Sequence, residues 1–121
     1  MAYATVEEVK AFAKISYEDL GYSSESEFDS FISTLIDYAS ALVEDYCNQS
    51  WETPPNTVKF VVIQICANTL HEILQRKINP IIQQSEFQLK LLVPNAFTDE
   101  LKRLLDVYKS FEIYREGEST T

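Results

Sequence analysis

The amino-acid sequence predicts an all-α fold, a small helical bundle of about four helices with a long extended loop or strand between the third and fourth helices. The chain of 121 residues contains only two glycines and four prolines, and 45% of its residues are hydrophobic, which favours long regular elements over a turn-rich β fold. Apolar residues recur at helical spacing in three long stretches. We expect a single helical domain over residues 1–111, with the segment 78–97 projecting from it, and a flexible tail at 112–121.

The first helix is expected to begin after Thr5. The threonine hydroxyl can accept a hydrogen bond from a backbone N–H, and Glu8 can reach back to the Thr5 N–H, which together form a capping box. The apolar stripe of this helix consists of Val6, Val9, Phe12 and Ala13. Helix propensity falls near Ile15, so we expect residues 16–25 to form a polar connection around Gly21.

The second helix should be the longest in the chain. Ser24 and Glu27 have the spacing of another capping box, and Asn48 marks the expected end. One apolar stripe runs the length of this helix: Phe28, Phe31, Ile32, Leu35, Ile36, Ala39, Leu42, Val43 and Tyr46. Trp51 follows in a short link, where its large aromatic ring can cover the junction with the next helix.

Residues 58–74 should form the central helix. Pro54 and Pro55 stand where proline is tolerated, at a helix start, and Pro80 lies just beyond the expected end. The main apolar stripe is Val58, Val61, Val62, Ile65, Cys66, Thr69, Leu70, Ile73 and Leu74. Further apolar residues on the remaining sides are Phe60, Ile63 and Ala67. A helix that is apolar on several sides must be covered by more than one neighbour.

The stretch 78–97 shows no helical period. Alternating apolar and polar residues predict a strand over 86–93, but no other part of the chain resembles a partner strand. An isolated strand leaves its backbone N–H and C=O groups unpaired, so we expect it to pair with a neighbouring subunit or another protein. The interface residues would be Phe87, Leu89, Lys90, Leu91 and Val93. A last helix, capped by Thr98, should carry Leu101, Leu104, Leu105, Tyr108 and Phe111.

The net charge of -9 lies entirely in the first half of the chain, because residues 1–53 hold 11 acidic and 2 basic residues whereas the rest is balanced. The outer side of the second helix should present an acidic exposed face, formed by Asp29, Asp37, Glu44 and Asp45. Binding to nucleic-acid phosphates requires clustered Lys and Arg, so this surface disfavours it. The simplest alternative is a solvated face that keeps the protein soluble.

Motifs for phosphate, zinc or redox chemistry are not found. The only glycines are Gly21 and Gly117, so there is no glycine-rich phosphate loop, and the single histidine, His71, excludes a His-rich zinc site. Cys47 and Cys66 fall on predicted helices and are most simply small core residues. The sequence shows neither a secretory leader nor an apolar run long enough to span a membrane, so we expect synthesis in the cytoplasm.

We consider one enzyme class for this acidic helical sequence, the all-helical magnesium-dependent pyrophosphohydrolases. Their metal ions are held by carboxylates spaced i, i+3 on facing helices. Here such a site would have to use Glu44, Asp45 and Glu72, which lack the paired acidic motifs that it needs. We therefore predict no enzymatic activity, no cofactor and no metal.

Three segments together resemble a known family. They are ATVEEVKAF (4–12), LIDYASALVEDYC (35–47) and PPNTVKFVVIQICANTLHE (54–72), and in this order they resemble the small head-to-tail connector, or adaptor, proteins of tailed bacteriophages. The matching residues are Thr5, Glu7 or Glu8, Val9 and Lys10 in the first segment; Leu35, Ile36, Ala39, Tyr46 and, one place off, Glu44 in the second; and Pro55, Val58, Lys59, Ala67, Leu70 and Glu72 in the third. The likeness covers about residues 3–113 and departs from the family pattern in a longer first connection and in the extended segment 78–97.

The resemblance implies a structural role in the virion. About twelve copies would form a ring below the portal protein, continue the DNA channel and dock the next connector, stopper or tail protein. DNA would pass through without being specifically bound, and no membrane is involved. The alternative is a free-standing acidic helical module that binds a host protein, for example by mimicking the charge of DNA.

Overall fold

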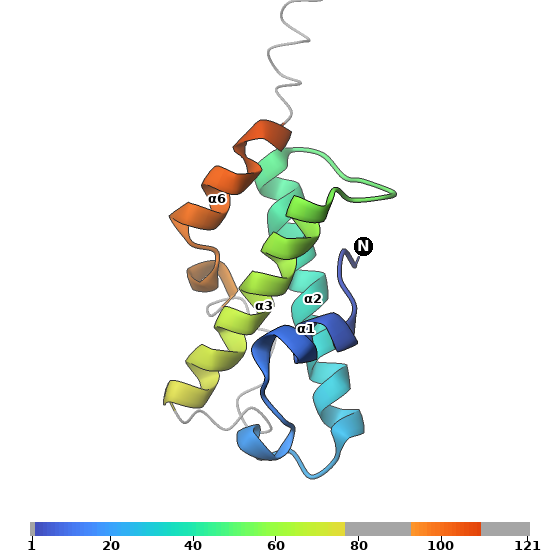
Figure 1. Ribbon diagram of the computed structural model, residues 1–121, viewed down its shortest axis with the longest axis vertical. Coiled ribbons are helices and arrows are strands. Elements are labelled where there is room, and N and C mark those ends of the chain that lie inside the picture. Colours follow the sequence, from blue (N-terminus) through green and yellow to red (C-terminus); the bar gives the residue numbers. More distant parts are fainter. Residues whose placement is uncertain (1, 77–92, 110–121) are drawn as a thin grey trace, which may run out of the picture.

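The computed structural model describes residues 2–76 and 93–109, and it is mostly helical, as the sequence predicts (Figure 1). The elements are α1 (Val6–Ala13), η1 (Glu18–Leu20), α2 (Glu25–Cys47), α3 (Asn56–Arg76), α6 (Asp99–Leu105) and η2 (Asp106–Tyr108), where η denotes a 3-10 turn. No strand occurs within the described ranges.

Helices α2 and α3 run antiparallel and form the centre of the fold (Figure 1). Helix α1 packs across both, mainly against α3, while α6 packs along α3. The core side of α2 consists of Phe28, Phe31, Ile32, Leu35, Ile36, Ala39, Ser40, Val43 and Cys47. The buried residues of α3 are Val58, Val61, Val62, Ile65, Cys66, Ala67, Thr69, Leu70 and Ile73. The prediction that α3 is covered on more than one side is confirmed, although Phe60 and Leu74 remain 42% and 39% exposed.

The hydropathy of α3 has a structural explanation. An 18-residue window within residues 56–75 has a mean hydropathy of 1.2 and the helix is long enough to cross a membrane, so length and composition alone would suit a membrane span. The helix nevertheless packs against α1, α2 and α6, and its apolar side chains fill the core of the fold. Burial within the protein therefore accounts for its apolar composition.

The three predicted helix caps are present. Thr5 Oγ1 accepts from the Glu8 N–H at 3.2 Å, and Glu8 Oε1 accepts from the Thr5 N–H at 2.9 Å, which completes the capping box. Ser24 and Thr98 begin α2 and α6 through equivalent side-chain bonds of 3.3 Å each. At its other end α2 stops at Asn48, whose φ of 56° lies in the left-handed region that asparagine tolerates.

The connection between α1 and α2 differs from the expected polar loop. It contains the turn η1 and three buried apolar side chains, Ile15, Leu20 and Tyr22. Tyr22 packs against the aromatic rings of Phe28 and Phe31, and Gly21 has a φ of 83° that glycine adopts without steric cost. Because these apolar residues are irregularly spaced, no periodic pattern in the sequence predicted their burial.

The prediction of an extended segment over residues 78–97 is wrong at the C-terminal end of that segment, because residues 93–96 are helical. Val93, Ala96 and Phe97 are all buried, at the i, i+3, i+4 spacing of a helix. That short period is hidden in the sequence because Val93 also completes the alternation that suggested a strand. Val93 therefore belongs to the core and not to an intersubunit interface. The other four expected interface residues, Phe87, Leu89, Lys90 and Leu91, lie outside the described residues, as does the tail 112–121.

The last helix is shorter than expected. Helix α6 ends at Leu105 and continues as η2 to Tyr108, and Phe111 lies beyond the described residues. Leu101 and Leu105 are buried as expected, whereas Leu104 is 44% exposed. Tyr108, in η2, is half-buried and still packs against the core, as expected.

Candidate functional site

Tyr3 is the best-connected side chain outside the helices. It is 2% exposed, and its backbone N–H donates to Ser40 Oγ at 3.1 Å. Its hydroxyl donates to Glu44 Oε2 and accepts from the Trp51 N–H at 3.0 Å. Burial, followed by the hydrogen bond to Glu44, raises the pKa of the phenol above its usual value. Tyr3 thereby ties the N-terminal segment to α2 and to the link before α3.

The spacing of two residues on α2 explains this docking. Ser40 and Glu44 are one helical turn apart and therefore lie on the same side of α2. Ser40 is fully buried and presents its hydroxyl to the backbone, while Glu44 is only partly buried and receives the phenol. The Trp51 indole packs edge-on against the Tyr3 ring with centroids 5.7 Å apart, which covers the helix junction as predicted.

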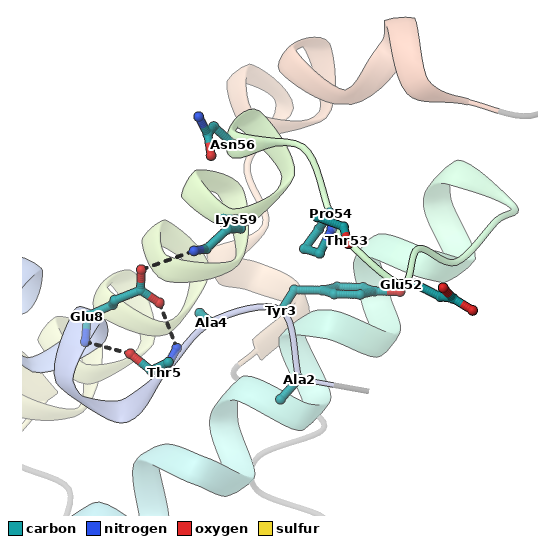
Figure 2. A pocket seen from close by; sticks show the side chains of 10 residues that line it. All are labelled: Ala2, Tyr3, Ala4, Thr5, Glu8, Glu52, Thr53, Pro54, Asn56 and Lys59. Atoms are coloured by element: carbon teal, nitrogen blue, oxygen red, sulfur yellow. Dashed lines mark hydrogen bonds and ion pairs between the residues drawn. The ribbon is translucent and has the colours of Figure 1, made fainter.

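Ion pairs join α1 to both long helices. Lys59 Nζ of α3 lies 3.3 Å from Glu8 Oε2, as Figure 2 shows. Lys10 Nζ lies 2.6 Å from Glu25 and 2.9 Å from Asp29 of α2. Glu8 thus serves two partners, and the hydrogen bond from the Thr5 N–H is the largest cause that lowers the pKa of its carboxyl.

A pocket of about 340 Å³ lies between the N-terminal segment and the start of α3 (Figure 2). Its wall is formed by Ala2, Tyr3, Ala4, Thr5, Glu8, Glu52, Thr53, Pro54, Asn56 and Lys59. The Glu8 and Lys59 charges compensate each other at this wall, and Thr5 is engaged in its capping box. The lining contains neither a histidine nor a cysteine.

A second group of contacts fastens the C-terminal elements to α2. Tyr46 donates its hydroxyl to Asp106 at 2.6 Å, and Lys109 Nζ lies 4.6 Å from the centroid of the Tyr46 ring. Gln49 donates to the Tyr108 carbonyl, and the aromatic rings of Trp51 and Tyr108 meet edge-on at 6.4 Å. Trp51 therefore contacts both the N-terminal segment and η2.

The predicted acidic face is only partly a free surface. Asp37 and Asp45 are exposed, as expected. Asp29 is paired with Lys10, and Glu44 accepts the hydrogen bond of Tyr3, so these two carboxylates hold neighbouring segments in place. The Asp29 side chain remains 41% exposed, whereas Glu44 is partly buried. Both positions border the buried stripe of α2, where a cation or phenol from another segment can reach them.

The residues considered for chemistry are dispersed. Cys47 and Cys66 are buried, and burial raises the pKa of their thiols to about 11 and about 12, so their interpretation as small core residues is confirmed. Glu44 and Asp45 lie near the C-terminal end of α2, whereas Glu72 lies near the C-terminal end of the antiparallel α3 (Figure 1). The three carboxylates of the magnesium hypothesis are therefore at opposite ends of the helix pair. Residues 2–76 and 93–109 contain no cluster of three potential metal ligands.

His71 is exposed on α3 and borders a depression of about 550 Å³. The other lining residues are Asn68, Glu72, Gln75, Asn95, Ala96 and Thr98. The Asn68 side-chain amide donates to the Ala96 carbonyl at 3.2 Å and so joins α3 to the turn before α6. This contact is structural and gives His71 no catalytic partner.

Sequence reasoning missed the role of Tyr3. The residue precedes the first cap and belongs to no periodic stripe, so nothing in its local pattern indicates burial. The available signals were an aromatic residue directly before a helix start and a serine, Ser40, on the core side of α2.

No protein-family model, no curated protein and no solved structure matches the chain.

Proposed function

We propose that the chain is a structural virion protein, an adaptor in the connector between the head and the tail of a tailed bacteriophage. The observation that carries the proposal is that charged residues from two of the three family-like segments meet one another. Glu8 of the first segment pairs with Lys59 of the third, although about fifty residues of sequence separate them. If the resemblance consisted only of helix caps that act independently, there would be no reason to expect Glu8 and Lys59 to contact each other.

The remaining matched residues support the same view. Val9, Ala39 and Val58, one from each segment, are fully buried in the common core. Lys10, the lysine of the first segment, pairs with Glu25 and Asp29 at the start of α2. The residues on which the resemblance rests are thus those that hold α1 against the two long helices, which is a constraint on fold and not on chemistry.

Two features favour a structural role over catalysis. Three polar residues that line the pocket of about 340 Å³ are engaged with one another, in the Thr5–Glu8 cap and the Glu8–Lys59 ion pair. Exposed Asp37 and Asp45 leave an acidic surface on α2, which suits a wall along which DNA slides without being held.

In this proposal about twelve copies form a closed ring below the portal protein, each copy contacting the next in the same head-to-tail manner. The segment 86–91, with Phe87, Leu89, Lys90 and Leu91, supplies a contact between copies or to the next connector protein, as its alternating pattern suggests. DNA passes through the channel, and a stopper or tail protein docks below.

The proposal is tested by isolating the chain, carrying an affinity tag, from cells in which particles assemble. Electron microscopy of the recovered assemblies should reveal a ring at the portal vertex of filled heads, and an antibody against the tag should label that vertex. The mass of the complex, measured by native mass spectrometry, gives the number of copies.

Recovery of the chain as a monomer bound to one host protein, with no label on particles, would contradict the connector role. That outcome would favour the alternative of an acidic module. A DNA mimic would then be released from its partner by competing duplex DNA and by salt, because both act on the same charged contacts.

A further inference from the structure

Residues 2–13, which we call the N-terminal arm, are attached differently from the rest of the fold. The arm comprises the segment before Thr5 and helix α1. The arm buries Tyr3, Ala4, Val9 and Ala13, whereas the buried stripes of α2 and α3 extend over residues 28–47 and 58–73. A helix of eight residues is not stable on its own, so the arm depends on contacts with its neighbours.

Many of those contacts are polar. The Tyr3 hydroxyl and backbone N–H bond to Glu44, Trp51 and Ser40. The two ion-pair sites of α1 lie near the surface, since the Lys59 and Glu8 side chains are 38% and 36% exposed and the Glu25 partner of Lys10 is 62% exposed. Exposed ion pairs are weak and are screened by salt.

Helix α6 is also short, but its described contacts are of another kind. Its one described ion pair, Lys102 with Asp99 at 3.9 Å, lies within the helix and joins it to nothing else. Its attachment relies on buried Leu101 and Leu105 and on the neighbouring Phe97. Salt should therefore weaken the ion pairs that attach α1 to its neighbours, whereas the ion pair of α6 does not attach that helix to anything else.

We propose that the N-terminal arm opens as a unit while α2 and α3 stay folded, and that the Tyr3 hydroxyl and the ion pair between Glu8 and Lys59 hold it closed. Opening uncovers the side of α3 that α1 covers and the edge of Trp51 that the Tyr3 aromatic ring covers. Raised ionic strength shifts the arm toward the open state. This device does not depend on the connector role.

The test is native-state hydrogen exchange on the full chain, followed at the backbone amides of α1, α2 and α6. Raising sodium chloride from about 0.02 M to about 0.5 M should speed exchange in α1 relative to α6. Lys59→Gln should speed exchange of the α1 amides about two- to five-fold, as expected for one exposed ion pair. Tyr3→Phe, which keeps the aromatic ring and removes the hydroxyl, should speed it about ten-fold or more.

Lys102→Gln is the matched control, because it removes the same charge from an ion pair that does not involve the arm. Exchange in α1 should then equal that of the parent chain. The proposal is overturned if α1 and α2 amides accelerate together in Lys59→Gln, which would mean that the arm opens only by global unfolding. It is equally overturned if neither salt nor Lys59→Gln changes exchange in α1. If Tyr3→Phe fails to fold, the exchange rates of the α1 amides in Lys59→Gln alone test the proposal.

Discussion

Replacement of Ile65 by alanine tests whether α3 is the centre of the core. The Ile65 side chain is fully buried in the middle of α3. The substitution removes three carbon atoms, which lowers the free energy of unfolding by roughly 2.4 kcal/mol at about 0.8 kcal/mol for each. An unrelaxed cavity of roughly 75 Å³ adds about 1.8 kcal/mol at about 24 cal/mol per Å³. Partial collapse of the cavity reduces the sum, so we expect a loss of about 2 to 4 kcal/mol.

The assay is urea unfolding followed by far-ultraviolet circular dichroism. With a slope of about 1.5 kcal/mol per M, the midpoint for Ile65→Ala should fall by about 1.3 to 2.7 M. Leu74→Ala is the matched control, because it removes the same number of carbon atoms from the same helix at a position that is 39% exposed. It should cost less than about 1 kcal/mol. Equal losses for the two variants, or a loss below about 1 kcal/mol for Ile65→Ala, would refute the assigned core.

Four further predictions follow from the described contacts and the proposed role. Cys47 and Cys66, which are 0% and 1% exposed, should resist an aromatic disulfide reagent in the folded chain and react only after denaturation; reaction of the native thiols would contradict their burial. Burial raises the pKa of the Cys66 thiol from its ordinary value of 9.0 to about 12. The hydrogen bond to Asp106 is the main cause that raises the pKa of the Tyr46 phenol from 10.0 to about 12. The unfolded chain thus loses these protons first, so the contribution of these two groups to the free energy of unfolding should be constant below pH about 9 and should decrease as the pH rises to about 12. The decrease should be less steep in Tyr46→Phe. Duplex DNA should not bind measurably at physiological salt, and micromolar affinity with a steep salt slope would argue against the channel role. Replacing residues 84–91 by a short Gly/Ser linker, with Val93 left in place, should preserve the helical fold and abolish assembly, whereas normal assembly would exclude strand sharing.

The helices could be predicted from the sequence because their signals are local. A cap such as Thr5 or Thr98 acts on an N–H three residues away, and a helical stripe repeats within a single element. The order of the helices and the central position of α3 followed from these signals. The exposure of Phe12, at 46%, could not be predicted, because it depends on which neighbouring residues reach its aromatic ring, here Phe60 of α3 at 6.0 Å between ring centroids.

The candidate site was much less predictable, since its contacts join residues distant in sequence. Tyr3 meets Glu44 and Trp51 only after α1, α2 and the link have taken their places. Asp29 was expected to lie on the exposed acidic face of α2, and only the packing of α1 brings Lys10 to it. A one-dimensional pattern records which face of a helix is polar but not which segment crosses that face.

The position of Trp51 has a consequence for rearranging the gene. Its indole contacts Tyr3, near the first described residue, and Tyr108, near the last, so the first and last described segments meet at one side chain. Segments that lie close together can be connected by a short linker, as in circular permutation. A permuted chain in which a linker joins residue 109 to residue 2, with new ends opened at exposed Ser23 before α2, should keep the same packing. Helix α1 would then follow α6 along the chain, so the same helices would occur in a different order.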